Sequence, residues 1–407
     1  MTGSATGLMG AVQHDPEKPD QRSRPAWGAV ISLALGTFGL VTAEFLPASV
    51  LTPLAHDLGI TEGAAGQTMT ATAIAAAISA PTMAIITKRL DRRIVLCAMM
   101  LLQILSNLLA EVAWSLPVFL AARVVLGIAL GGFWSISASL AMRLVPNHLL
   151  PRAMSIILTG VSVAVVCAPP IGAYVGDIWG WRAPFMITAV VNAITLLVQL
   201  VTMPTLPPVE MAGCRSLLDV AKKPTIKVAL LVIVLVASGH FASFTYIRAF
   251  LEKTALNIEM ISLLLLVSGI GGFFGNLAGA FLAPHSLKAV AALPSLLMAI
   301  AAISLLMLGR SDWAWAIAIV IWSFAFGAVP VGLQTWTVLR AVPEQAESAG
   351  VLMTSTFQVA IAAGAIFGGL LVKNAGVTSV LAYSAGATFL AAFTVFLLGP
   401  KRANLTS

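Results

Sequence analysis

Long apolar stretches alternate with short polar loops along the whole chain of 407 residues. About 20 apolar residues in a helix cross the hydrocarbon core of a bilayer, and twelve stretches reach that length. Only 10% of the residues are charged and 59% are hydrophobic, whereas about a quarter of a soluble domain is charged. The pattern predicts an all-α integral membrane protein with twelve transmembrane helices, at 28–51, 64–86, 94–113, 117–141, 153–176, 183–203, 228–250, 259–283, 289–308, 313–336, 349–372 and 378–399.

The longest polar interruption between these stretches is rich in proline and charge. It leaves six apolar stretches on either side, so the chain divides into two six-helix halves of nearly equal length. We predict a polar tail at 1–26, a first half at 27–203, a linker at 204–227, a second half at 228–399 and a second tail at 400–407.

Lysine and arginine are unevenly distributed between the two sets of loops. The loops on the side of both termini hold 17 of the 23, and one, Arg123, lies inside an apolar stretch. The opposite loops hold five, namely Arg182, Arg248, Lys253, Arg310 and Lys373. Because basic residues accumulate in cytoplasmic loops, both termini and the linker are predicted to be cytoplasmic. The same bias accounts for the net charge of +7, and no basic run with interleaved aromatics indicates a nucleic-acid partner.

The sequence lacks the motifs of bond-making chemistry. The three cysteines are far apart, and no Cys/His cluster has metal-ligand spacing. No glycine-rich loop of the GxxxxGKS/T type occurs, so ATP-driven transport is unsupported. We predict a protein that is not an enzyme and holds no metal and no cofactor.

Two charged residues lie well inside predicted membrane helices, away from the helix ends. Glu44 stands about two-thirds of the way along 28–51, and Arg123 lies six residues into 117–141. A charge inside the membrane is costly and marks a functional site by default, often a proton relay. We predict that Glu44 carries a coupled proton and that Arg123 is its charge partner. The alternatives are a Glu44 held by packing or one hydrogen bond alone, and an Arg123 that reaches the membrane surface.

Aromatic side chains gather in the predicted helix 228–250. At helical spacing, Phe241, Phe244 and Arg248 form one stripe that would present aromatic faces and a cation to a flat ligand. His240 lies beside this stripe and is ambiguous. Aromatic residues of membrane helices more often face lipid, and this stays the alternative for each of them.

The loop at 88–93 resembles a signature of the major facilitator superfamily. In that signature an aspartate, here Asp91, caps a helix, and basic residues, here Arg92 and Arg93, pair across the two halves of the protein. Thr87 stands where the signature has glycine. The alternative is a loop that is merely positive.

Two predicted helices carry further motifs of this superfamily. Arg123, followed by Gly127, Gly131 and Trp134 at helical spacing, resembles the fourth-helix motif of its proton-coupled exporters, with the glycines opening space beside the arginine. A second segment resembles the fifth-helix motif of antiporters, in which proline interrupts helical hydrogen bonding and small residues let neighbouring helices slide. A plain kinked helix is the alternative for that segment, which consists of Pro169, Pro170 and Gly172.

Longer stretches resemble a narrower family, the bacterial purine ribonucleoside efflux pumps. They include 44–49, 130–134, 142–146 and 244–248, and the resemblance covers all twelve predicted helices. It implies a multi-pass antiporter of the inner membrane that exports nucleosides such as inosine and guanosine in exchange for protons. We predict a monomer whose partners are the nucleoside, the proton and the bilayer.

A purine nucleoside is planar and rich in hydrogen-bonding edges, so its site should combine aromatic faces with polar side chains. Trp134 and Gln334 therefore join Phe241, Phe244 and Arg248 as predicted substrate-binding residues. Two other functions stay open. One is a broader proton-driven exporter of drugs or sugar derivatives with the same fold, and the other is a transceptor that does not transport.

Overall fold

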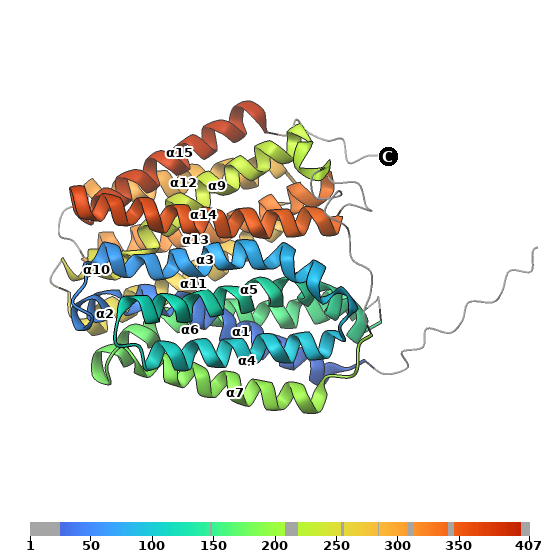
Figure 1. The fold of residues 1–407 in the computed structure, drawn as a ribbon. Coiled ribbons are helices and arrows are strands. Elements are labelled where there is room, and N and C mark those ends of the chain that lie inside the picture. The colour runs from blue at the N-terminus through green and yellow to red at the C-terminus, as the bar shows by residue number, and fades with distance from the viewer. Residues whose placement is uncertain are drawn as a thin grey trace, which may run out of the picture.

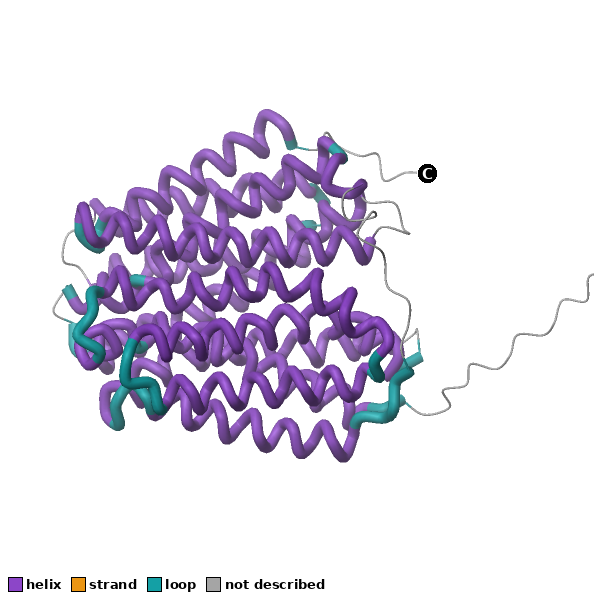
Figure 2. Tube along the Cα trace, viewed as in Figure 1, coloured by secondary structure: helices purple, strands orange, loops and turns teal. Residues whose placement is uncertain are grey.

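A computed structural model of the chain describes residues 25–146, 149–207, 219–253, 256–283, 285–307, 312–340 and 346–399. In these ranges every regular element is a helix (Figure 2), and twelve helices have 20 residues or more. They are α1 (Trp27–Ser49), α3 (Glu62–Ile86), α4 (Arg92–Glu111), α5 (Leu116–Leu144), α6 (Leu150–Ile178), α7 (Ala183–Thr202), α9 (Pro224–Thr245), α11 (Ile258–Leu282), α12 (Leu287–Met307), α13 (Asp312–Arg340), α14 (Ala346–Ala375) and α15 (Ser379–Leu398). The predicted all-α architecture of twelve long helices is confirmed.

The first helix of each half stops early and continues as a short second helix. After α1 comes α2 (Leu51–Asp57), and after α9 comes α10 (Ile247–Glu252). The residues at the two breaks, Val50 and Tyr246, have ψ angles of 17° and 15°, outside the helical range. The prediction of one continuous helix over 228–250 is therefore wrong.

Local chemistry accounts for the first break and marks the second. Pro47 near the end of α1 has no backbone N–H and crowds the preceding turn, which weakens the last turn of that helix. In α9 the hydroxyl of Thr245 donates to the carbonyl of Phe241 at 2.6 Å, a bond of the kind that bends helices. Thr188 and Thr388 make the same bond within unbroken helices, so this bond accompanies the second break without explaining it alone.

The long helices form two six-helix halves that meet along two pairs of helices. The N-terminal half contains α1 to α7, and the C-terminal half contains α9 to α15. Across the interface α3 packs against α14, and α6 packs against α11. Figure 1 shows α3 lying between α14 and its own neighbour α5. The facing sides of α3 and α14 therefore form part of the interface between the halves.

The outer surface of the bundle is apolar. Eleven of the described helices are long and apolar enough to cross a membrane. The remaining long helix, α3, is rich in alanine and threonine and packs against α5 and α14. Large apolar side chains are exposed on the outside, among them Val201 at 86% and Leu197 at 64%. An exposed apolar surface of this kind is suited to contact with lipid.

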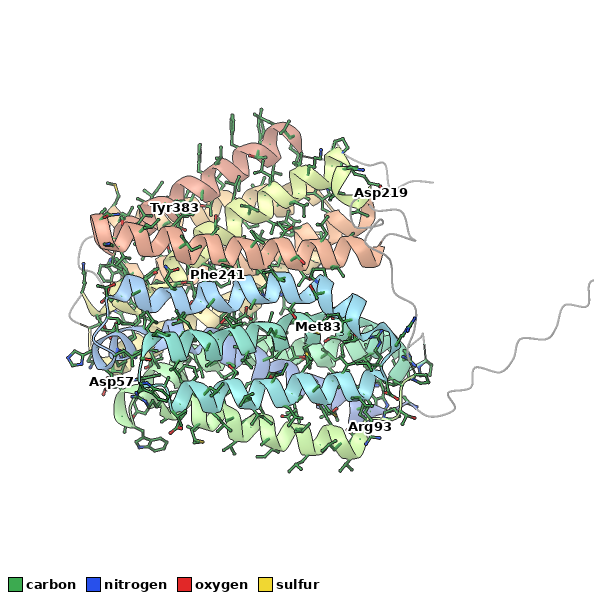
Figure 3. The ribbon with its side chains drawn as sticks, in the orientation of Figure 1. Asp57, Met83, Arg93, Asp219, Phe241 and Tyr383 are labelled. Atoms are coloured by element: carbon green, nitrogen blue, oxygen red, sulfur yellow. The ribbon has the colours of Figure 1, made fainter. Side chains whose placement is uncertain are left out.

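The bundle has two distinct ends. One, called the α2 end below, carries α2 and α10, and the other, called the linker end, is where α1 begins and α15 ends (Figure 1). Figure 3 shows Asp57 at the α2 end, Arg93 and Asp219 at the linker end, and Phe241 midway between them. Mid-depth residues such as Phe241 mark the region where a transported ligand would have to pass.

Candidate functional site

A buried polar contact joins the two halves at mid-depth. The side-chain amide of Gln358 on α14 donates to a carboxylate oxygen of Glu44 on α1 at 3.3 Å. Glu44 is 7% exposed and Gln358 is 6% exposed. A carboxylate at this place is linked to both halves, so a change in its charge acts on their interface.

Arg123 lies next to this contact, inside the N-terminal half. Its side chain is fully buried, so the alternative that it reaches the membrane surface does not describe this structure. It donates from Nε to the hydroxyl of Thr72 at 3.1 Å and from Nη2 to the backbone carbonyl of Ala43 at 2.8 Å. The third nitrogen, Nη1, is buried without a hydrogen-bond partner. The guanidinium therefore binds α1 at the residue that precedes Glu44.

The predicted pairing of Glu44 with Arg123 takes a different form from a direct ion pair. Both side chains belong to the described part of the chain, and no ion pair joins them. Gln358 contacts the carboxylate instead, and Arg123 contacts the adjacent carbonyl. The cation is thus held at the peptide carbonyl that precedes Glu44, and its Nη1 makes no hydrogen bond.

The residues that follow Glu44 and precede Gln358 in sequence bring aromatic rings of the two halves together. Phe45, next to Glu44, lies 5.4 Å from Phe244 and 6.1 Å from Phe241 between ring centroids. Phe357, next to Gln358, lies 6.1 Å from Phe241. We call the whole group the central aromatic cluster, and its members are Phe45, His240, Phe241, Phe244, Trp322, Phe326 and Phe357.

Arg248 is not placed with Phe241 and Phe244. It lies on α10, beyond the break at Tyr246, and its side chain is 3% exposed. Its guanidinium donates to the carbonyl of Ser49 on α1 at 2.7 Å and to Glu252 at 2.7 Å, and it forms an ion pair with Asp177 on α6 at 3.7 Å. The predicted ligand-facing stripe is therefore wrong for Arg248 in this structure, because the break turns it toward the α2 end.

The structure places one other predicted substrate residue, Trp134, apart from the cluster. Trp134 on α5 packs against Phe133, with ring centroids 6.5 Å apart, and belongs to the apolar core of the N-terminal half. No ring contact joins it to the cluster among the described side chains. Gln334 lies on α13, but its side chain falls outside the described residues.

The loop before α4 holds the beginning of the linker. Asp91 accepts from the backbone N–H of Arg93 at 2.8 Å and from that of Leu206 at 3.1 Å. The backbone N–H of Arg92 donates to the carbonyl of Leu206 at 2.9 Å. Asp91 therefore caps α4 and, with the same carboxylate, anchors the chain that leads out of the N-terminal half.

The two arginine side chains of this loop also bind within the N-terminal half. Arg92 donates to the hydroxyl of Thr87 at 2.9 Å, which gives a role to the residue that replaces the glycine of the signature. Arg93 donates to the carbonyl of Leu200 on α7. These two contacts do not provide the predicted pairing across the halves.

Small residues let helices approach at two of the predicted motifs. A Cβ at Gly127 on α5 would collide with the carbonyl oxygen of Thr72 on α3, and a Cβ at Gly172 on α6 would lie 2.5 Å from the hydroxyl of Ser49. The chain around Pro169 and Pro170 stays helical within α6. These residues therefore set the spacing of α5 and α6 from their neighbours.

Sequence reasoning missed Gln358 and undervalued His240. Gln358 is an amide inside a predicted span, but nothing local indicates that it faces Glu44. His240 is the one histidine inside a predicted span, and its ring stacks on Phe326 with centroids 3.5 Å apart. A polar residue in an apolar span was the available signal in both cases.

Two helical halves with an apolar outer surface that meet at a buried carboxylate and an aromatic cluster fit a membrane transporter. The family comparison agrees, since the model of the Major Facilitator Superfamily matches residues 33–365. The chain belongs to this superfamily.

Known proteins resemble the chain over nearly its whole length. The purine ribonucleoside efflux pump NepI of Salmonella paratyphi B is 37% identical over 379 residues, which cover 93% of this chain and 95% of that protein. The pump of the same name from Salmonella paratyphi A is 38% identical over the same shares.

The structural comparison gives the same fold. A bacterial homologue of the human lysosomal transporter Spinster, in an inward-facing and occupied conformation, matches with a TM-score of 0.74 and 18% identity, covering 92% of this chain and 97% of the other. The same homologue in an inward-facing and unoccupied conformation matches with a TM-score of 0.71 and 16% identity, covering 94% of this chain and 100% of the other.

Proposed function

We propose that this transporter exports purine ribonucleosides, such as inosine and guanosine, from the cytoplasm in exchange for protons. The substrate class is supported by the relatives named purine ribonucleoside efflux pumps, at 37–38% identity over 93% of the chain. It is also supported by the central aromatic cluster, whose flat rings suit the faces of a heterocyclic base. The proton is the coupling ion, and no other cofactor is involved.

The contact between Glu44 and Gln358 carries the proposal of proton coupling. A hydrogen bond to an ionised carboxylate is about twice as strong as one between neutral groups. Protonation of Glu44 therefore weakens its bond to Gln358 and removes a negative charge near Arg123. Both effects change the free energy of the interface between α1 and α14. We propose that transport proceeds by alternating access, in which the halves open in turn to either side of the membrane, and that proton binding biases the equilibrium between these two orientations.

Orientation and assembly complete the proposal. We place the linker end on the cytoplasmic side of a bacterial inner membrane, because 17 of the 23 basic residues belong to the loops and termini assigned there. The halves that form the site belong to one chain, so a monomer is the working unit.

The test is uphill transport into proteoliposomes that contain the purified full chain. An imposed pH gradient should drive accumulation of labelled inosine, and unlabelled guanosine should compete, whereas a cationic drug and a sugar derivative should not. Liposomes without protein are the control for leakage. Competition by the drug alone would favour the broader exporter, and counterflow without any response to the pH gradient would remove proton coupling.

A further inference from the structure

Two ring nitrogens of the central aromatic cluster are buried without a hydrogen-bond partner. They are Nδ1 of His240 on α9 and Nε1 of Trp322 on α13. The side chain of His240 is 5% exposed and that of Trp322 is 1% exposed. The two rings stack with centroids 4.2 Å apart at an angle of 20°, so the unpaired nitrogens belong to neighbouring, nearly parallel rings.

Neither nitrogen makes a hydrogen bond that would stabilise the observed fold. About nine in ten buried polar groups in proteins have a hydrogen-bond partner, because an unpaired one destabilises the fold. The rings around His240 are Phe241, Phe244 and Phe326, and none of them offers a strong acceptor or donor. A phenylalanine at position 240 would pack on the same rings without leaving a polar atom unpaired.

The place of the pair in the bundle suits a ligand. Phe326, which stacks on His240, also lines a small apolar cavity together with Phe357, between α9, α13 and α14. The same cluster reaches Phe45, beside the carboxylate of Glu44. His240 and Trp322 do not line this cavity of about 10 Å³ themselves, but Phe326 connects His240 to it. The unpaired nitrogens therefore belong to the central aromatic cluster, in which the two halves meet.

We propose that His240 and Trp322 bind the polar edge of the heterocyclic base of the transported nucleoside and thereby determine specificity. This inference rests on the proposed function. The indole N–H of Trp322 is a donor only, so it requires an acceptor such as the 6-oxo group of a purine. A neutral imidazole donates from one nitrogen and accepts at the other, so His240 matches a second group on the same edge.

Substitutions separate recognition from packing, because the two roles predict opposite outcomes. His240→Phe and Trp322→Phe keep a flat ring but remove the nitrogens. We expect an unchanged or higher melting temperature with a loss of inosine affinity of about tenfold or more, since one good hydrogen bond corresponds to about that factor. His240→Gln, which keeps a donor and an acceptor, should retain more affinity than His240→Phe.

Gln103 on α4 gives the matched control. It is fully buried in the N-terminal half, and both polar atoms of its side chain lack a partner. Gln103→Leu thus removes unpaired polar atoms away from the cluster. It should raise the melting temperature and leave inosine affinity unchanged.

The experiment measures inosine binding by calorimetry and the melting temperature, on purified full-length protein in detergent micelles. Purine riboside, which lacks the 6-oxo group, should bind the wild type more weakly than inosine does, and Trp322→Phe should abolish that difference. If the wild type binds inosine and both phenylalanine variants bind it equally well, the inference is wrong and the proposed function stands. If the wild type binds no purine nucleoside, both fall. If His240→Phe does not fold, the outcome is decided by His240→Gln and Trp322→Phe, and wild-type affinity in both contradicts the inference.

Discussion

The amide of Gln358 donates a 3.3 Å hydrogen bond to the carboxylate of Glu44, a residue 314 positions earlier in the chain and in the other half of the molecule. Arg123 contacts the carbonyl of Ala43, immediately before that carboxylate. The side chain of Glu44 thus contacts the C-terminal half. The peptide carbonyl just before Glu44 is held by the buried guanidinium of Arg123. This relationship gives the most direct test of the proposed proton coupling.

Glu44→Gln keeps the size of the side chain and its hydrogen-bonding capacity but removes its charge and its proton. Uphill export of inosine in proteoliposomes should fall by about tenfold or more, whereas inosine binding should stay close to the wild-type value. Glu259→Gln, at the start of α11, is the control and should behave as wild type. Export by Glu44→Gln with an unaltered pH dependence would make Glu44 a structural residue.

Arg248→Met should loosen the α2 end. Arg248 bonds from α10 to the carbonyl of Ser49 and to Asp177, both in the N-terminal half, so its loss weakens a contact between halves. The probe is a single cysteine placed at position 49 of a protein without other cysteines. We expect this cysteine to react several times faster with a membrane-impermeant maleimide, added on the α2 side, when Arg248→Met is present than when it is absent. The readout is the labelling rate.

Arg182→Met is the matched control for that measurement. Arg182 also lies at the α2 end, but its partners, Asp57 and the carbonyl of Ala113, belong to its own half. It should leave the labelling of position 49 unchanged. Equal acceleration by both substitutions would show that general loosening, and not the contact between halves, controls access.

Gly127→Ala should destabilise the protein although alanine is the better helix former. A Cβ at position 127 would collide with the carbonyl oxygen of Thr72 on α3, so backbone must move, at a cost of about 1–3 kcal/mol. Gly386→Ala on α15 has nothing within 4 Å of the added Cβ. It should be neutral or gain up to about 1 kcal/mol from helix propensity. The measurement is the change in melting temperature in detergent. A decrease for Gly127→Ala without a decrease for Gly386→Ala would agree with this packing, and an unchanged melting temperature for Gly127→Ala would contradict it.

Native Cys214 reports the orientation of the chain, because it belongs to the predicted linker. With the partly buried Cys97 and Cys167 replaced by alanine, an impermeant maleimide should label Cys214 in inside-out vesicles and not in intact cells. Labelling in intact cells would overturn the orientation inferred from the basic residues. Labelling after detergent solubilisation controls for a cysteine that is simply unreactive.

The hydrophobic pattern determined the helices by itself, because spanning length and apolar composition are properties of a continuous segment. Each of the twelve long helices begins and ends within a few residues of a predicted span, apart from the breaks at Val50 and Tyr246. The positions of Glu44 and Arg123 inside these spans also identified the region of the site. A charged residue inside a membrane helix is rare, so it can be recognised from the sequence alone.

Only the tertiary structure decided which groups meet. The choice of Gln358 as the partner of Glu44 depends on how α1 and α14 are rotated and packed, and no local pattern encodes that. Arg248 illustrates the same limit, because the helix breaks at Tyr246 and places Arg248 on α10, away from Phe241 and Phe244. The prediction that residues at helical spacing share one face assumes a straight helix axis. Beyond a bend, that prediction fails within one turn. Contacts between side chains depend on how whole helices pack, and that packing is determined by many residues of the sequence together, not by any local pattern.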